Sequence, residues 1–213
     1  AIDKEEILEG AYSGVGEVAH TIFPEDHWAY PDDFEPYTHD PDRARELLEE
    51  AGHGDGISFE MATLPAEDQV RRAEILQAQL AEVGMDLTIE SAPVAEITSR
   101  FNEEDEFPLT NSAWTGRPAP QLTFDLVFRP EGYFNAGDVE VPGLTEHLDA
   151  ADTADTVEEQ AEALGQAANV VAEQGAFVPI QIRAQLVAFT PEAHGFEPNQ
   201  LGKLRTDNMY MDQ

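Results

Sequence analysis

The sequence predicts an α/β fold with a mostly parallel sheet flanked by helices. Apolar residues recur at steps of three and four in some segments, as in amphipathic helices, and alternate in others, as in half-buried strands. Strand and helix patterns follow one another over residues 57–114, an order typical of parallel strands joined by crossover helices. The chain of 213 residues is long enough for one domain with a sizeable core.

Capping residues and glycines mark the ends of the predicted helices. Asp3 is placed as a helix N-cap, with Glu6 positioned to complete a capping box. Asp40 and Pro41 begin a second helix, and Gly52 follows its end. The predicted helices cover, in chain order, residues 3–10, 41–51, 66–83, 94–102, 144–148 and 156–175.

The strand and burial predictions rest on apolar spacing. Predicted strands cover residues 57–62, 87–89 and 107–114, and residues 177–190 form a further strand region. The predicted buried helix faces consist of Ala44, Leu47, Leu48 and Ala51 in one helix and Val157, Ala161, Leu164, Ala168 and Val171 in the last one. Residues 15–39 are rich in proline and aromatic side chains and are interpreted as a loop.

The stretch Asn111–Phe128 places a large aromatic residue and a cation at the end of a predicted strand. That strand ends at Trp114, and Arg117 precedes Pro118, which biases Arg117 away from the helical region. In open α/β sheets, ligands collect beyond the carboxyl ends of the strands. An arginine held there offers a planar fork of donors that matches a carboxylate or phosphate. The alternative is that Arg117 is a solvated loop charge and Trp114 a core anchor.

Acidic residues dominate the charge of the chain. Asp and Glu number 44 against 11 Lys and Arg, which gives a formal net charge of −33, and the two lysines are Lys4 and Lys203. The sequence has no basic patch that could displace counterions, so binding to nucleic acid or to an anionic membrane is disfavoured. Disorder is disfavoured because 41% of the residues are hydrophobic and clearly periodic. We interpret the acidity as adaptation to high salt, since the Debye length is roughly 3 Å at about 1 M salt.

The sequence predicts no metal site and no cofactor. The chain has no cysteine, and its six histidines show no metal-ligand spacing. The acidic run of residues 103–106 lacks the spaced ligands and glycine of a calcium loop and is interpreted as a solvated turn. No glycine-rich phosphate loop follows a predicted strand. Asp125 and Glu131 would be the acid and base of a salt-adapted extracellular hydrolase domain, which is the alternative function.

Several segments along the chain together resemble one transport family. In chain order they are AIDKEEI, YTHDPDRARELLEEAG, ISFEM, ILQAQLAEVGMDLTIE and SAWTGRPAP. This ordered set is similar to the carboxyl-terminal lobe of ABC-transporter solute-binding proteins of the peptide/nickel type, which include dipeptide, oligopeptide, nickel and glutathione binders. The resemblance implies a type II periplasmic-binding-protein-like lobe. It also implies a binding protein, not an enzyme, which captures a solute between two lobes.

The resemblance further indicates which residues face the ligand. These are Trp114, Thr115, Gly116, Arg117, Phe134 and Asn135. In the peptide-binding branch of the family an aspartate near this WTG position pairs with the ligand's amino terminus. Here Arg117 stands in its place, as in the WSGR-type branch that includes glutathione binders. This departure implies a small peptide-like or carboxylate-bearing solute with its anionic group facing Arg117.

Family members run to roughly twice this length or more, a multi-domain size, so the chain resembles a fragment that lacks the first lobe. Residues 1–188 would be the carboxyl-terminal ligand-binding lobe, and residues 189–213 a return segment towards the first lobe. The whole protein is expected to be extracytoplasmic, either periplasmic or cell-surface, and lipid-anchored. Its expected partners are a small-molecule or peptide ligand and the permease subunits of an ABC transporter.

Overall fold

The computed structural model describes residues 1–34, 37–104, 106–115, 117, 119–197 and 205–212. Its elements are α1 (Lys4–Tyr12), β1 (Glu17–Val18), α2 (Pro41–Glu50), β2 (Ile57–Thr63), α3 (Glu67–Glu82), β3 (Met85–Ser91), α4 (Val94–Asn102), β4 (Leu109–Asn111), α5 (Gln121–Val127), the 3-10 helix η1 (Ala136–Asp138), α6 (Leu144–Thr153), α7 (Val157–Glu173), β5 (Gln181–Ile182), β6 (Ala193–His194) and β7 (Tyr210–Met211). Among the helices in these described ranges, none is long and apolar enough to cross a membrane.

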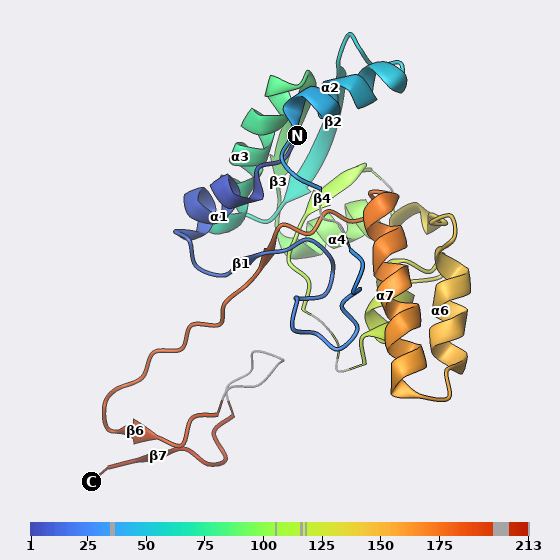
Figure 1. Cartoon of the computed structure of the whole chain (residues 1–213). Coiled ribbons are helices and arrows are strands. Elements are labelled where there is room, and N and C mark those ends of the chain that lie inside the picture. The colour runs from blue at the N-terminus through green and yellow to red at the C-terminus, as the bar shows by residue number, and fades with distance from the viewer. Residues whose placement is uncertain (35–36, 105, 116, 118, 198–204, 213) are drawn as a thin grey trace.

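A three-stranded parallel sheet forms the first layer of the fold, with β2 between β3 and β4. Met61 of β2 packs in one cluster with residues of α3, whereas Ala62 packs in another with Ile97 of α4 and with Phe107. Neighbouring strand residues point to opposite faces of a sheet, so helices cover the sheet from both sides. The predicted parallel sheet flanked by helices is therefore confirmed, and Figure 1 shows α3 lying along β2 and β3.

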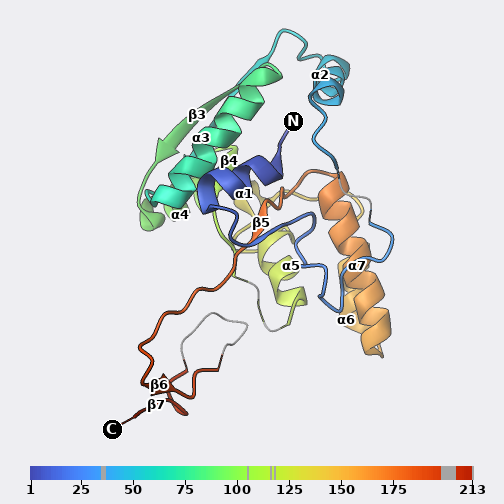
Figure 2. The ribbon, with the colours of Figure 1, turned by 60° about the vertical axis from the view of Figure 1, so that its left-hand side comes forward.

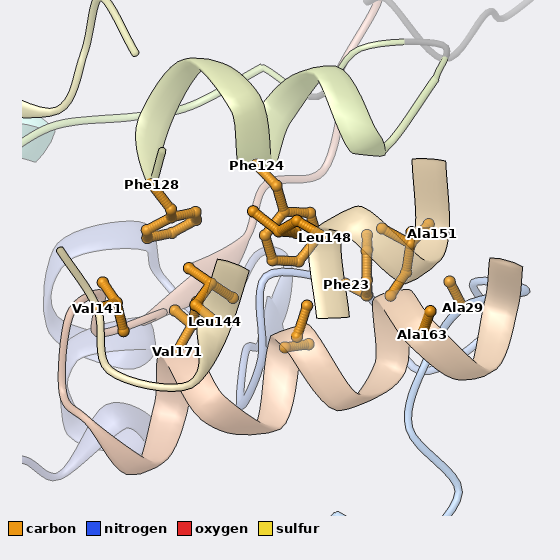
Figure 3. Close-up of a cluster of buried hydrophobic side chains, with 13 residues drawn as sticks. Phe23, Ala29, Phe124, Phe128, Val141, Leu144, Leu148, Ala151, Ala163 and Val171 are labelled. Carbon is orange, nitrogen blue, oxygen red and sulfur yellow. The ribbon is translucent and has the colours of Figure 1, made fainter. Parts of the chain in front are cut away.

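Helices α5, α6 and α7 form a second layer with its own hydrophobic core (Figure 1). Figure 3 shows Phe124 of α5, Leu148 of α6 and Val171 of α7 in this cluster. Phe23 and Ala29 come from the loop after β1 and complete it. The aromatic-rich loop thus packs on the helical layer, which explains how a segment without regular structure is held in place.

The predicted N-caps are correct, whereas the predicted capping box at Glu6 and some predicted buried positions are wrong. The Asp3 amide donates to the side chain of Gln79, and the Glu6 carboxylate also binds Gln79. Asp3 and Asp40 are N-caps whose carboxylates accept hydrogen bonds from backbone amides three residues later. Leu47 is 49% exposed because it borders an apolar hollow of about 340 Å³ beside α2 and is not covered. Ala51 is exposed after the last turn of the same helix. Val157 is 63% exposed because it lies in the first turn of α7, before the residues that pack in the helical core.

β2 and β3 extend beyond the strands predicted at 57–62 and 87–89, whereas β4 and β5 are shorter than the strand regions predicted at 107–114 and 177–190. β4 contains three residues, so the chain from Ser112 to Thr115 already lies in a loop. In the predicted strand region of residues 177–190, β5 pairs through two residues with β1 in an antiparallel ribbon. Beyond β5 the chain leaves both layers and ends in the β6–β7 pair (Figures 1 and 2). Leu186, Val187 and Phe189 are exposed along this extended segment.

Arg100 on α4 joins three carboxylates of the sheet layer. Its guanidinium forms ion pairs with Glu90 of β3, with Glu96 one helical turn earlier at 3.2 Å and with Glu106 at 2.6 Å. It also lies over the ring of Phe107, 4.4 Å from the ring centroid. The hydrogen bond from Arg100 lowers the pKa of the Glu106 carboxyl. The contribution of that pair to stability is therefore present at neutral pH and is lost as the pH falls through the lowered pKa.

The helical core generates a first prediction. Leu148→Ala should lower the free energy of unfolding by about 2–5 kcal/mol, because Leu148 is fully buried and its truncation leaves a cavity. The matched control is Val157→Ala on α7, which should change it by no more than about 0.5 kcal/mol because Val157 is exposed. Chemical denaturation followed by circular dichroism measures both values. Similar losses in the two variants would contradict this placement of the core.

Candidate functional site

The predicted site lies where the sheet layer meets the helical layer. Trp114 follows β4, and its ring lies 5.1 Å from the ring of Phe134, which follows α5, at an interplanar angle of 79°. The indole Nε1 of Trp114 donates a hydrogen bond to Thr123 Oγ1 of α5 at 3.3 Å. Trp114 is half-buried, so one part of its side chain is anchored in the fold and another part remains accessible. The structure thus brings together two of the residues that the sequence assigned to the ligand.

Arg117 extends this aromatic contact. Its guanidinium carbon lies 5.1 Å from the centroid of the Trp114 ring, a distance suited to a cation–π interaction. Arg117 and Thr115 are exposed. Gly116, which was also predicted to face the ligand, lies outside the described residues. Arg117 is therefore oriented by an aromatic ring and keeps its outer face open to solvent.

Phe134 and Asn135 have different surroundings. Phe134 contacts Trp114 directly, so the two aromatic rings form one continuous wall. The side-chain amide of Asn135 donates to the backbone carbonyls of Arg129 at 2.9 Å and Val139 at 2.8 Å. Its oxygen accepts from the amide of Val139 at 3.1 Å. Asn135 therefore closes the loop that carries Phe134, and most of its hydrogen-bonding capacity is used within that loop.

Tyr133 belongs to the same wall, although the sequence analysis did not assign it to the site. Its ring lies 4.9 Å from that of Phe134 at an angle of 84°, and the residue is 57% exposed. We call the row formed by Trp114, Phe134 and Tyr133 the aromatic wall, and Arg117 lies on its Trp114 end. The signal in the sequence was the adjacent pair of aromatic residues, which lies in a loop and has no periodicity to reveal its direction.

Arg129 joins helix α5 to helix α6. Its guanidinium forms ion pairs with Asp125 of α5 at 2.8 Å and with Asp149 and Asp152 of α6 at 3.0 and 2.8 Å. The side chain of Arg129 is 20% exposed, whereas those of Asp149 and Asp152 are 65% and 39% exposed, so these ion pairs are partly open to solvent. Asp125 thus has a structural partner, and Glu131 is exposed. The geometry gives no support to Asp125 as a catalytic group of a hydrolase.

A separate hollow of about 260 Å³ lies beside the β1–β5 ribbon. Its lining includes Glu17, His20, Glu25 and Tyr30, and none of the predicted site residues contributes to it. The Nδ1 atom of His20 is buried there without a hydrogen-bond partner among the described residues. Burial lowers the pKa of His20, and the nearby charge of Lys4 lowers it further. In the aromatic wall, in contrast, Trp114 and Phe134 are half-buried and Tyr133 is exposed.

The loop closed by Asn135 generates a second prediction. Asn135→Ala should lower the free energy of unfolding by roughly 1–3 kcal/mol, because it removes the hydrogen bonds to Arg129 and Val139. The fluorescence of Trp114 should also shift to longer wavelength as Phe134 loses its support. Glu140→Ala, an exposed substitution one residue past that loop, should leave both quantities unchanged. Equal behaviour of the two variants would remove Asn135 from any supporting role.

Comparison with known proteins gives the chain a family. Residues 1–134 match the family model described as the middle part of bacterial extracellular solute-binding proteins, family 5. The dipeptide-binding protein of Escherichia coli (strain K12) is 33% identical over 121 residues, which cover 54% of this chain and 22% of that protein. Heme-binding protein A of Haemophilus influenzae is 26% identical over 210 residues, covering 95% of this chain and 38% of that protein. The chain therefore spans less than half the length of these relatives.

Solved structures agree on the fold. The ABC transporter-associated periplasmic binding protein DppA from Helicobacter pylori, in complex with peptide STSA, has a TM-score of 0.85 at 20% identity and covers 100% of this chain with 42% of its own. The oligopeptide-binding protein AppA from Bacillus subtilis, in complex with a nonapeptide, has a TM-score of 0.85 at 18% identity, covering 100% of this chain with 46% of its own. These similarities confirm the predicted type II periplasmic-binding-protein-like lobe. The chain belongs to the bacterial extracellular solute-binding proteins, family 5.

Proposed function

We propose that the protein binds a small peptide-like or carboxylate-bearing solute for import by an ABC transporter, and is not an enzyme. The observation that supports this ligand class is the position of Arg117. Its guanidinium lies on the aromatic wall, is exposed, and has no carboxylate within ion-pair distance among the described residues. A free guanidinium beside an apolar wall suits a ligand with a carboxylate and an apolar body.

Most of the other arginines form ion pairs with carboxylates, whereas Arg117 forms none among the described residues. The following arginines form ion pairs with Asp or Glu: Arg43, Arg45, Arg100, Arg129, Arg183 and Arg205. In a chain with 44 acidic and 11 basic residues, an arginine finds a carboxylate partner easily. An arginine that is kept apart from them at the edge of a predicted site is available for an anionic ligand.

The names of relatives support a peptide-like solute. The E. coli relative is a dipeptide-binding protein, and the H. pylori structure holds the peptide STSA. Other relatives are named glutathione-binding protein and heme-binding protein, so the family covers several solutes with carboxylate groups or apolar bodies. We propose that Trp114, Thr115, Gly116, Arg117 and Phe134 face the ligand, and that Asn135 acts by supporting the loop that carries Phe134.

The family also suggests the setting in which the chain works. Its members are extracellular solute-binding proteins, so we place the protein outside the cytoplasm, with a lipid anchor as the finer proposal. We propose residues 1–188 as the ligand-binding lobe and residues 189–213 as a return segment that packs on a first lobe. The ligand would then lie between the two lobes and be enclosed by hinge closure, before delivery to permease subunits.

Peptides with free and amidated carboxyl ends test the role of Arg117 in the full-length protein. Arg117→Ala should weaken binding of a free di- or tripeptide by roughly a hundredfold, because the buried ligand carboxylate loses its charged partner. The same substitution should change binding of the carboxyl-amidated peptide little. Arg117→Lys should restore part of the loss, since an ammonium lacks the bidentate fork. Isothermal titration calorimetry measures all these affinities.

The matched control for this experiment is Arg71→Ala, because Arg71 is also an exposed arginine without an ion pair among the described residues. It should leave both peptides unaffected. Equal losses for free and amidated peptides in Arg117→Ala would refute carboxylate recognition. Unchanged affinities would return Arg117 to the alternative interpretation of a solvated loop charge.

We also propose that the acidic surface is an adaptation to high salt. The melting temperature should rise steeply between about 0.1 M and about 1 M potassium chloride, because salt screens repulsion among the carboxylates. Near pH 4, where many carboxylates are protonated, the same titration should be shallower. Differential scanning calorimetry measures both series. A flat or falling melting temperature at neutral pH would exclude the adaptation.

A further inference from the structure

One arginine of this chain is buried without an acidic partner. Arg72 lies on α3 and is 5% exposed. Within the described residues its guanidinium forms no ion pair; its Nη2 donates to Gln69 Oε1 at 2.6 Å and to the backbone carbonyl of Ser112 at 2.8 Å. Its Nε is buried without a partner in the same part of the structure.

Burial makes this arrangement costly. It lowers the pKa of the Arg72 guanidinium, and the neighbouring Tyr12 and Asp68 offset this effect in part. A buried charge held by neutral acceptors is weak evidence for a stabilising role, because an apolar side chain of similar size is often neutral or better for stability. The role of Arg72 is therefore better inferred from the groups that it binds than from its contribution to the free energy of unfolding.

Arg72 holds the first residue of the loop that leads to the aromatic wall. Ser112 directly follows β4, and two residues later the chain reaches Trp114, within about 7 Å of extended backbone. Asn111, the last residue of β4, is fixed as well, because its amide donates to Thr63 Oγ1 and to the Gln69 carbonyl, each at 2.9 Å. The α3 residues Gln69 and Arg72 therefore set both the end of β4 and the start of the loop.

We infer that Arg72 is a positioning residue for the ligand site. It fixes the backbone of Ser112, and thereby the orientation of Trp114 and of the Arg117 guanidinium that lies on the Trp114 ring. The inference rests on the proposed function in so far as the aromatic wall binds a ligand. The position of Trp114 can be measured without any ligand, however, so the two proposals can fail separately.

Tryptophan fluorescence of this chain tests the inference. Trp28→Phe leaves Trp114 as the remaining one of the two tryptophans. In that background Arg72→Met should shift the emission of Trp114 to longer wavelength and increase its quenching by acrylamide, because the loop start is released. The melting temperature should stay the same or rise, since a buried charge is replaced by an apolar side chain. Arg72→Lys should restore part of the fluorescence, because an ammonium can still reach one of the two acceptors.

Arg71→Met is the matched control, since Arg71 is the exposed neighbour on the same helix and should leave Trp114 unchanged. Unchanged Trp114 fluorescence in Arg72→Met would overturn the inference. The inference would also be overturned if Arg72→Met lowered the melting temperature so far that unfolded protein accounted for the whole fluorescence change. Arg72 would then be an ordinary stabilising residue. If Arg72→Met does not fold, Gln69→Leu replaces it. Gln69→Leu removes the acceptor that orients the guanidinium and should expose Trp114 in the same direction; no change would again refute the role.

Discussion

The contact between Trp114 and Phe134 joins two loops that come from different layers of the fold. Trp114 follows the sheet layer, whereas Phe134 follows α5 of the helical layer, and Thr123 of α5 accepts the indole hydrogen bond. Such an aromatic pair contributes about 0.5–1.5 kcal/mol beyond the area it buries. Its larger consequence is geometric, because together with the indole hydrogen bond to Thr123 it holds the two loops that form the aromatic wall next to each other.

A shortage of cations constrains the rest of the structure. With 11 basic residues against 44 acidic ones, the chain has four acidic residues for each basic one. Arg100 and Arg129 each bind three of them and join separate elements, a role suited to the five donors of a guanidinium. Arg72 and Arg117, which lie near the end of β4, differ from these two, because neither forms an ion pair with a carboxylate among the described residues. Arg72 binds neutral acceptors, and Arg117 lies on an aromatic ring.

Local signals predicted the elements of the fold better than its buried surfaces. The cap at Asp40 depends on neighbouring residues alone, and the structure confirms it. The exposure of Leu47 depends on what lies opposite α2, which no spacing within the helix can reveal. Helix α5 is absent from the predicted helices; it begins directly after Pro120, and proline is tolerated at a helix start. The same holds for the site, because the burial of Arg72 depends on distant parts of the chain and no pattern around position 72 indicates it.

The exposure of Arg117 on the aromatic wall separates two properties of the site, the orientation of its guanidinium and its affinity for a ligand carboxylate. In water an ion pair at 4 Å is worth about 1 kcal/mol, and about 4 kcal/mol where the effective dielectric constant is near 20. Arg117 is exposed, so a carboxylate that reached it here would meet the weaker case. The Trp114 ring nevertheless restricts the guanidinium before any ligand arrives, which reduces the entropy lost on binding. Trp114 thus orients the guanidinium of Arg117, whereas the affinity for a carboxylate depends on the exclusion of water from the outer face of the aromatic wall.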